Sequence, residues 1–136
     1  MKRLILLSIV MIAMGSFLGN AQSSKKETPA SATNKVEAYY FHFNARCETC
    51  RTVESEAKAA IETLYPGRAT FKAINLDDAS SKEIAEKLKI SGQTLLIVKG
   101  DKQVNLTNEG FLYAMTNPAK LKSIIKQKVD GLLDLQ

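Results

Sequence analysis

Apolar and polar positions along residues 36–76 follow first a strand-like and then a helix-like pattern. Val36–Phe43 is an uninterrupted apolar and aromatic run, which is typical of a strand covered on both faces. In the next segment apolar residues recur at steps of three and four, as on one face of a helix that ends at Pro66-Gly67: Cys50, Val53, Ala57, Ala60, Ile61 and Leu64. Thr70–Leu76 predicts a second strand, which ends at Asp77-Asp78.

The pattern continues with a short helix and two further strands. Ser80 followed three residues later by Glu83 is a capping-box signature, and the helix that it predicts carries Ile84, Ala85 and Leu88 on its apolar face. Thr94–Val98 predicts a third strand. Gly100-Asp101 is a turn signal, and it leads into an antiparallel edge strand at Lys102–Leu106.

A final helix is predicted to begin at Asn117-Pro118, an N-cap residue followed by proline at the first helical position. Its apolar residues share one face: Leu121, Ile124, Ile125, Val129, Leu132 and Leu133. The order of elements is therefore strand, helix, strand, helix, strand, strand, helix. That order predicts an α/β fold, with a mixed central sheet and helices on both faces.

The first residues have the pattern of an export signal. Lys2 and Arg3 precede the mostly apolar Leu4–Leu18, and small residues surround a cleavage site between Ala21 and Gln22. The apolar stretch of about 15 residues is shorter than the ~20 that span a bilayer. We therefore prefer a cleaved signal peptide, and an uncleaved membrane anchor is the alternative. We expect residues 1–21 to be a cleaved signal peptide, residues 22–34 a flexible linker without large apolar side chains, and residues 35–136 one domain in the periplasm.

The charge balance changes little in this interpretation. Loss of Lys2 and Arg3 leaves 17 of the 19 basic residues against 14 acidic ones, a net charge of +3. The lysines are spread along the chain rather than clustered, which argues against a nucleic-acid partner. We expect a monomer.

The candidate chemistry lies in the only two cysteines, which occur as Cys47-Glu48-Thr49-Cys50 between the first strand and its helix. A C-x-x-C motif at this junction of a βαβ unit is typical of a redox dithiol, and its spacing allows a disulfide. The helix N-terminus, Arg46 and Arg51 should lower the thiol pKa, whereas the Glu48 carboxylate should raise it. We expect Cys47 to be the nucleophile and Cys50 the resolving residue.

Other roles for the cysteines remain open. An inert disulfide closing so short a loop would stabilise the fold little, and a structural zinc site needs about four ligands, whereas Cys47, Cys50 and His42 are three. We interpret His42 as a hydrogen-bonded residue of the sheet. Capture of arsenite, zinc or copper by Cys47 and Cys50 is the alternative to redox chemistry.

Residues 35–129 resemble the thioredoxin-like superfamily in four segments, namely the aromatic strand running into Arg46–Arg51, Ile74–Asp77, Ile90–Ile97 and Lys99–Lys102. The resemblance implies a three-layer sandwich, exchange with protein thiols or disulfides, a membrane or periplasmic redox partner and no organic cofactor. Tyr40–Cys47 is also similar to small exported proteins labelled as a nitrophenyl compound nitroreductase subunit and associated with arsenic-resistance operons. That similarity suggests a third role, an accessory subunit passing electrons to a reductase.

The chain departs from ordinary thioredoxins at three positions. Arg46 replaces the tryptophan before the first cysteine, and Phe41 replaces the buried acid used for proton transfer. Gln93 stands at the position of the cis-proline, directly before Thr94, in the loop expected to contact substrate. Because a non-proline cis bond costs ~2.5 to 4 kcal/mol, we expect a trans peptide bond and a differently shaped loop here. The Gln93 amide is expected to be available for a hydrogen bond to substrate.

Overall fold

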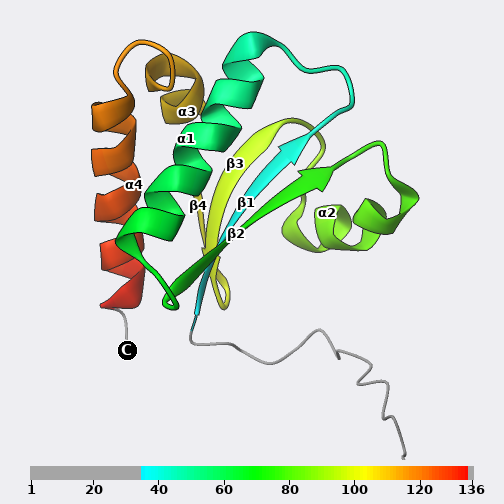
Figure 1. Ribbon diagram of the computed structural model, residues 1–136. Helices are drawn as coiled ribbons and strands as arrows, with labels where there is room; N and C mark the ends of the chain where they lie inside the picture. The colour runs from blue at the N-terminus through cyan, green and yellow to red at the C-terminus, as the bar shows by residue number, and fades with distance from the viewer. Residues whose placement is uncertain (1–34, 135–136) are drawn as a thin grey trace, which may run out of the picture. The chain divides into compact units, whose positions relative to one another are not determined.

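The computed structural model describes residues 35–134, which form a four-stranded sheet between two layers of helices (Figure 1). The strands are β1 Val36–His42, β2 Ala69–Asn75, β3 Thr94–Lys99 and β4 Lys102–Asn105. The helices are α1 Glu48–Leu64, the 3-10 turn η1 Ala79–Ser81, α2 Lys82–Leu88, α3 Thr107–Tyr113 and α4 Pro118–Leu133. Every predicted strand is present, with its ends shifted by one residue at most. The predicted α/β sandwich with helices on both faces is confirmed.

The predicted signal peptide (1–21), its cleavage site between Ala21 and Gln22, and the predicted linker (22–34) lie outside the described residues. Within residues 35–134, no helix is both long enough and apolar enough to cross a membrane.

The strand order β2-β1-β3-β4 places β1 inside the sheet. It pairs in parallel with β2 and antiparallel with β3, so that Tyr40 lies between Ala73 and Leu95, and β4 forms the antiparallel edge next to β3. Because β1 has a neighbour on each side and helices on each face, nearly all its side chains are buried. This burial explains the uninterrupted apolar run in the sequence.

Two hydrophobic clusters lie on opposite faces of the sheet. Alternate residues of β1 enter each cluster, as the two-residue period of a strand requires: Tyr40 packs with side chains of α1, α3 and α4, whereas Tyr39 and Phe41 pack with Ala85 and Leu88 of α2. Figure 1 shows α1, α3 and α4 on one side of the sheet and α2 on the other. The first cysteine lies where β1 leaves this sandwich.

Helix α3 was not predicted. It is only seven residues long, contains Gly110, and leaves Leu112 with 60% of its surface exposed, so it lacks the continuous apolar face that marks a helix in sequence. A Cβ on Gly110 would come within 3.0 Å of Val53 Cγ1, which shows how closely α3 approaches α1. Tertiary packing therefore stabilises this helix, and its intrinsic propensity does not.

The predicted capping box at Ser80 and Glu83 is wrong. Helix α2 begins at Lys82, after Ser81 in the N-cap position, and Ser80 lies within the preceding 3-10 turn. The Ser81 side chain makes no cap bond and instead donates to the backbone carbonyl of Asn75 at the end of β2. A tertiary hydrogen bond to the sheet thus replaces the local one.

Candidate functional site

The candidate site begins in the five residues that connect β1 to α1. The backbone N–H of Asn44 donates to the Asp77 carboxylate at 2.7 Å, and the Asn75 side-chain amide donates to the Asn44 side-chain oxygen at 2.8 Å. Both partners lie at the carboxyl end of the parallel strand β2. These two bonds attach the connecting segment to the sheet and position the next residues, Arg46 and Cys47.

Cys47 and Cys50 form a disulfide at the N-terminus of α1, with their Cα atoms 5.1 Å apart. Cys47 is the N-cap residue, and its sulfur accepts a hydrogen bond from the backbone N–H of Cys50 at 3.2 Å. Cys47 is exposed, whereas Cys50 is only 3% exposed. The unpaired N–H groups of the first helical turn favour negative charge on this sulfur. The arrangement supports Cys47 as the nucleophile.

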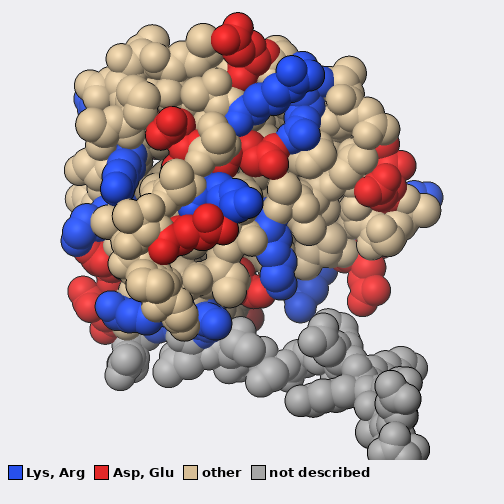
Figure 2. Space-filling view, in the orientation of Figure 1, with Lys and Arg blue, Asp and Glu red and all other residues tan. Residues whose placement is uncertain are grey.

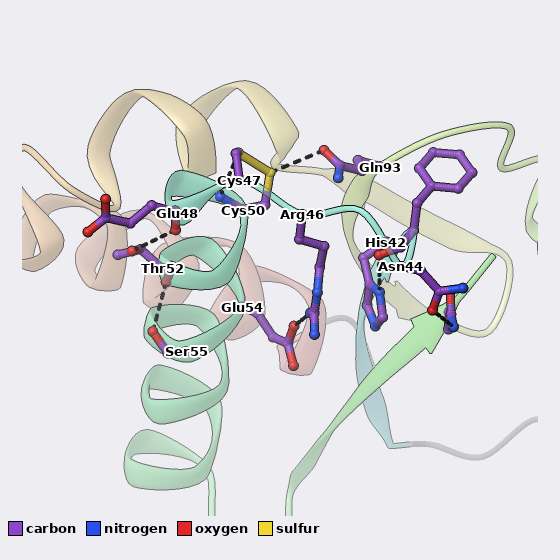
Figure 3. Close-up of polar contacts among 12 residues, drawn as sticks. His42, Asn44, Arg46, Cys47, Glu48, Cys50, Thr52, Glu54, Ser55 and Gln93 are labelled. Atoms are coloured by element: carbon purple, nitrogen blue, oxygen red, sulfur yellow. Dashed lines mark hydrogen bonds and ion pairs between the residues drawn. A yellow bond between two sulfur atoms is a disulfide. The ribbon is translucent and has the colours of Figure 1, made fainter. Parts of the chain in front are cut away.

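Arg46 points away from the sulfurs toward Glu54, and the two side chains form an ion pair (Figure 3). Each side chain is 25% exposed, so the pair is partly shielded from water. Glu54 lies four residues after Cys50, one turn further along α1. The sequence predicted that the positive charge of Arg46 lowers the thiol pKa, but it did not indicate that the Glu54 carboxylate binds this charge. The ion pair reduces the lowering of the thiol pKa that we expect from Arg46.

The other two charged residues of the motif lie at the surface. Glu48 and Arg51 are both exposed. Figure 3 shows the Glu48 carboxylate extending away from the disulfide, on the side opposite Gln93. The Glu48 carboxylate should therefore raise the thiol pKa less than its position between the two cysteines in the sequence would indicate.

Gln93 approaches the disulfide from the loop before β3 (Figure 3). Its side-chain Oε1 lies 3.5 Å from the Cys50 sulfur, close enough to accept a weak hydrogen bond when Cys50 is a thiol. No peptide bond within residues 35–134 is cis, which confirms the predicted trans bond before Gln93. Thr94, also expected to contact substrate, is 8% exposed, and its hydroxyl donates to the Gly92 carbonyl at 2.9 Å.

A buried tyrosine lies on the face of the sheet beneath α1. The Tyr40 ring is fully buried, and its hydroxyl has no hydrogen-bond partner among the described residues. Burial, and then the negative charge of Glu54, raise the pKa of Tyr40 to about 12, while Arg46 acts in the opposite direction. Phe41 is equally buried but faces α2, so β1 supplies no carboxyl group near the sulfurs.

No protein-family model and no curated protein matches the chain. Among solved structures, Trxlp from Edwardsiella tarda aligns with 69% of this chain and 84% of its own, at a TM-score of 0.51 and 17% identity. The fold is thioredoxin-like. A thioredoxin from Fasciola hepatica aligns with 71% of this chain and 83% of its own, at a TM-score of 0.47 and 19% identity. A malarial protein covers 51% of this chain and 74% of its own, at a TM-score of 0.41 and 20% identity.

An open groove of about 320 Å³ lies between the segment after β1 and helix α2 of this thioredoxin-like domain. It is lined by Phe43, Leu76, Ser81, Lys82, Ala85, Glu86, Ile90 and Ser91. Phe43 is among the few large apolar side chains with appreciable exposure, and Ser91 is two residues from Gln93. The groove therefore combines an apolar wall with the loop that reaches the sulfurs.

His42 takes no part in the site. It is buried at the end of β1, and its Nδ1 lies 3.1 Å from the Phe43 carbonyl oxygen, in agreement with its interpretation as a hydrogen-bonded residue of the sheet. In the part of the chain that the structure describes, no three His, Cys, Asp or Glu side chains are grouped so that they could hold a metal ion.

A contact made by the segment that follows α3 was likewise not predicted. The Thr49 hydroxyl, between the two cysteines, donates to the sulfur of Met115 at 3.1 Å. Met115 follows α3 in the connection to α4, 65 residues after Cys50 in the sequence. No local pattern in the sequence indicates that these residues meet.

Proposed function

We propose that this protein is an exported thiol-disulfide oxidoreductase that alternates between a Cys47–Cys50 disulfide and a dithiol. The observation that carries the proposal is the pairing of an exposed N-cap cysteine with a buried cysteine of the same helix, at the carboxyl end of the central strand. In that arrangement one sulfur meets the partner and the other remains covered until it is needed.

The reaction in the reducing direction has two steps. The Cys47 thiolate attacks one sulfur of a partner disulfide, forming a mixed disulfide and releasing a partner thiolate, which takes up a proton. Cys50 then loses its proton and attacks the Cys47 sulfur. This second step releases the other partner thiolate and closes the Cys47–Cys50 bond. Two electrons and two protons pass to the partner, and the reverse sequence oxidises a partner dithiol.

The partners on this proposal are protein thiols or disulfides, including a membrane or periplasmic redox partner. The groove lined by Phe43 and Ile90 is suited to the residues that flank a partner cysteine, because it is open and borders the loop carrying Gln93. The Gln93 amide supplies a hydrogen-bonding group at the sulfur itself. The reaction needs no organic cofactor, since the electrons are held on sulfur.

Insulin reduction tests the proposal. The reduced wild-type protein should reduce insulin catalytically, and Cys47→Ser should abolish the activity. Cys50→Ser should instead accumulate a mixed disulfide, because the first step remains possible and the second does not. Glu62→Gln, an exposed change about three turns further along α1 than Cys50, serves as a control with unchanged activity. Activity that persists in Cys47→Ser would refute the proposal.

Two further measurements test which cysteine is the nucleophile and in which direction electrons flow. An alkylating agent should modify Cys47 well before Cys50, because only Cys47 is exposed; equal rates would contradict the assignment. The reduction potential decides the direction of electron flow: a value near ~−270 mV favours a reductase and one near ~−120 mV an oxidase.

Export is tested by the mass of the protein recovered from its native cell. Cleavage after Ala21 would give a chain beginning at Gln22, whereas a chain that retains Met1 would contradict the proposed signal peptide.

A further inference from the structure

The sulfur of Met115 contacts the residue that lies between the two cysteines and directly precedes Cys50 in the sequence. This sulfur accepts a hydrogen bond of 3.1 Å from the hydroxyl of that residue, Thr49. The side chain is 51% exposed, so burial does not explain its position. The thioether has a second lone pair, which this hydrogen bond leaves available.

The backbone that carries Met115 is firmly positioned although its side chain is exposed. Gly110 allows α3 to approach Val53 of α1 closely, and Ala114, the residue before Met115, is fully buried. Two residues after Met115 is Asn117, whose side chain caps α4 by accepting from the Lys120 N–H. Met115 therefore has a fixed backbone and a flexible side chain with three rotatable bonds, which can move toward the cysteines.

From this geometry we propose that the reduced Cys47 and Cys50 and the thioether of Met115 form a three-sulfur site for a soft monovalent cation, with Cu(I) as the matching ion. Thiolate and thioether ligands select Cu(I) over harder cations. Zinc is a poorer match, since a structural zinc site takes four ligands and the described residues offer no cluster of three His, Cys, Asp or Glu.

The surroundings of the site agree with a cation of low charge. Figure 2 shows Lys and Arg interspersed with Asp and Glu on the face that it draws, rather than gathered into a field of one sign. Two thiolates binding one Cu(I) leave a single net negative charge, located at the helix N-terminus that favours it.

Binding of the ion balances without an added oxidant or reductant. The two thiols release two protons, two Cu–thiolate bonds and one Cu–thioether bond form, and copper remains Cu(I). The disulfide has no thiolate to offer, so the site exists only in the reduced protein. Binding of Cu(I) and oxidation of the dithiol therefore exclude one another.

The test is a competition titration of the full chain, reduced and freed of added thiol, with Cu(I) and a chromophoric Cu(I) chelator. Met115→Leu, which keeps the apolar bulk and removes the sulfur, should weaken Cu(I) binding by about tenfold or more. Leu112→Ala, an exposed change in α3 three residues before Met115, is the matched control and should leave the affinity unchanged. X-ray absorption at the copper edge should count three sulfur ligands in the wild type and two in Met115→Leu.

A second probe distinguishes loss of the Met115 ligand from a change in the shape of the dithiol. It is a trivalent organic arsenical, which bonds only to the two thiolates. Its affinity should be equal in the wild type and Met115→Leu. Equal losses for Cu(I) and the arsenical would overturn the proposal, as would unchanged Cu(I) affinity in Met115→Leu or two sulfur ligands in the wild type. Because insulin reduction is measured without copper, failure of the oxidoreductase proposal is distinguishable from failure of this one.

Discussion

The ion pair between Arg46 and Glu54 should control the acidity of Cys47. In the structure Arg46 directs its charge toward Glu54 rather than toward the adjacent sulfur. Replacing the carboxylate in Glu54→Gln removes the partner of Arg46 and leaves its guanidinium available to the Cys47 thiolate. We therefore expect the pKa of Cys47 to fall in this variant.

The magnitude follows from the separation that a released side chain can reach. A guanidinium about 6 Å from the sulfur stabilises the thiolate by roughly 0.7 to 2.8 kcal/mol for effective dielectric constants between about 80 and 20. That range corresponds to roughly 0.5 to 2 pKa units, and for a partly exposed pair we expect a decrease of about one unit. Stabilising the thiolate stabilises the reduced form, so the reduction potential should rise by up to about 30 mV.

The pKa can be measured from the ultraviolet absorbance of the thiolate and, independently, from the pH dependence of the alkylation rate of Cys47. Glu62→Gln, on the same helix and remote from the sulfurs, should have no effect. The decisive comparison repeats Glu54→Gln in an Arg46→Met background. If the pKa falls equally there, the cause is the loss of a nearby negative charge, and the release of Arg46 is refuted.

Three further predictions concern the packing of the helices against the sheet and against one another. Gly110→Leu should lower the free energy of unfolding by about 1 to 3 kcal/mol, because the new side chain collides with Val53; an unchanged urea midpoint would contradict this packing. Tyr65→Phe should lower the free energy of unfolding by about 1 kcal/mol, since the Tyr65 hydroxyl donates to the Asp130 carboxylate at 2.6 Å. The hydrogen bond from Lys126, and after it the one from Tyr65, lower the Asp130 pKa, so an NMR titration should show a higher Asp130 pKa in this variant. Above pH 10 the unfolded state loses the Tyr40 proton, while the folded state retains it until its raised pKa of about 12. Tyr40 should therefore contribute a fall in stability of about 1.4 kcal/mol per pH unit over that interval. Tyr40→Phe removes this contribution and leaves those of Tyr39 and Tyr65, whose pKa values burial also raises.

Much of the fold can be predicted from the sequence because its determinants are local. The apolar run of β1 and the three-to-four spacing of apolar residues along α1 indicate which side chains face the core. The burial of these side chains in the folded domain follows from the two patterns. The position of Cys47 and Cys50 between a strand and a helix is equally local. The absence of a proline at Gln93 was sufficient to predict a trans bond, since the cost of a cis bond depends on the residue itself.

The remaining features of the site depend on residues that meet only after the chain has folded. Helix α3 gains its stability from the contact between Gly110 and Val53, and this contact in turn brings Met115 to Thr49. Arg46 is paired with Glu54 because the segment after β1 is held to the end of β2 by hydrogen bonds between elements distant in sequence. Periodicity reports which face of an element is buried, but it does not report which surface side chains of different elements become neighbours. The electrostatic and sulfur environment of the dithiol is set by such neighbours.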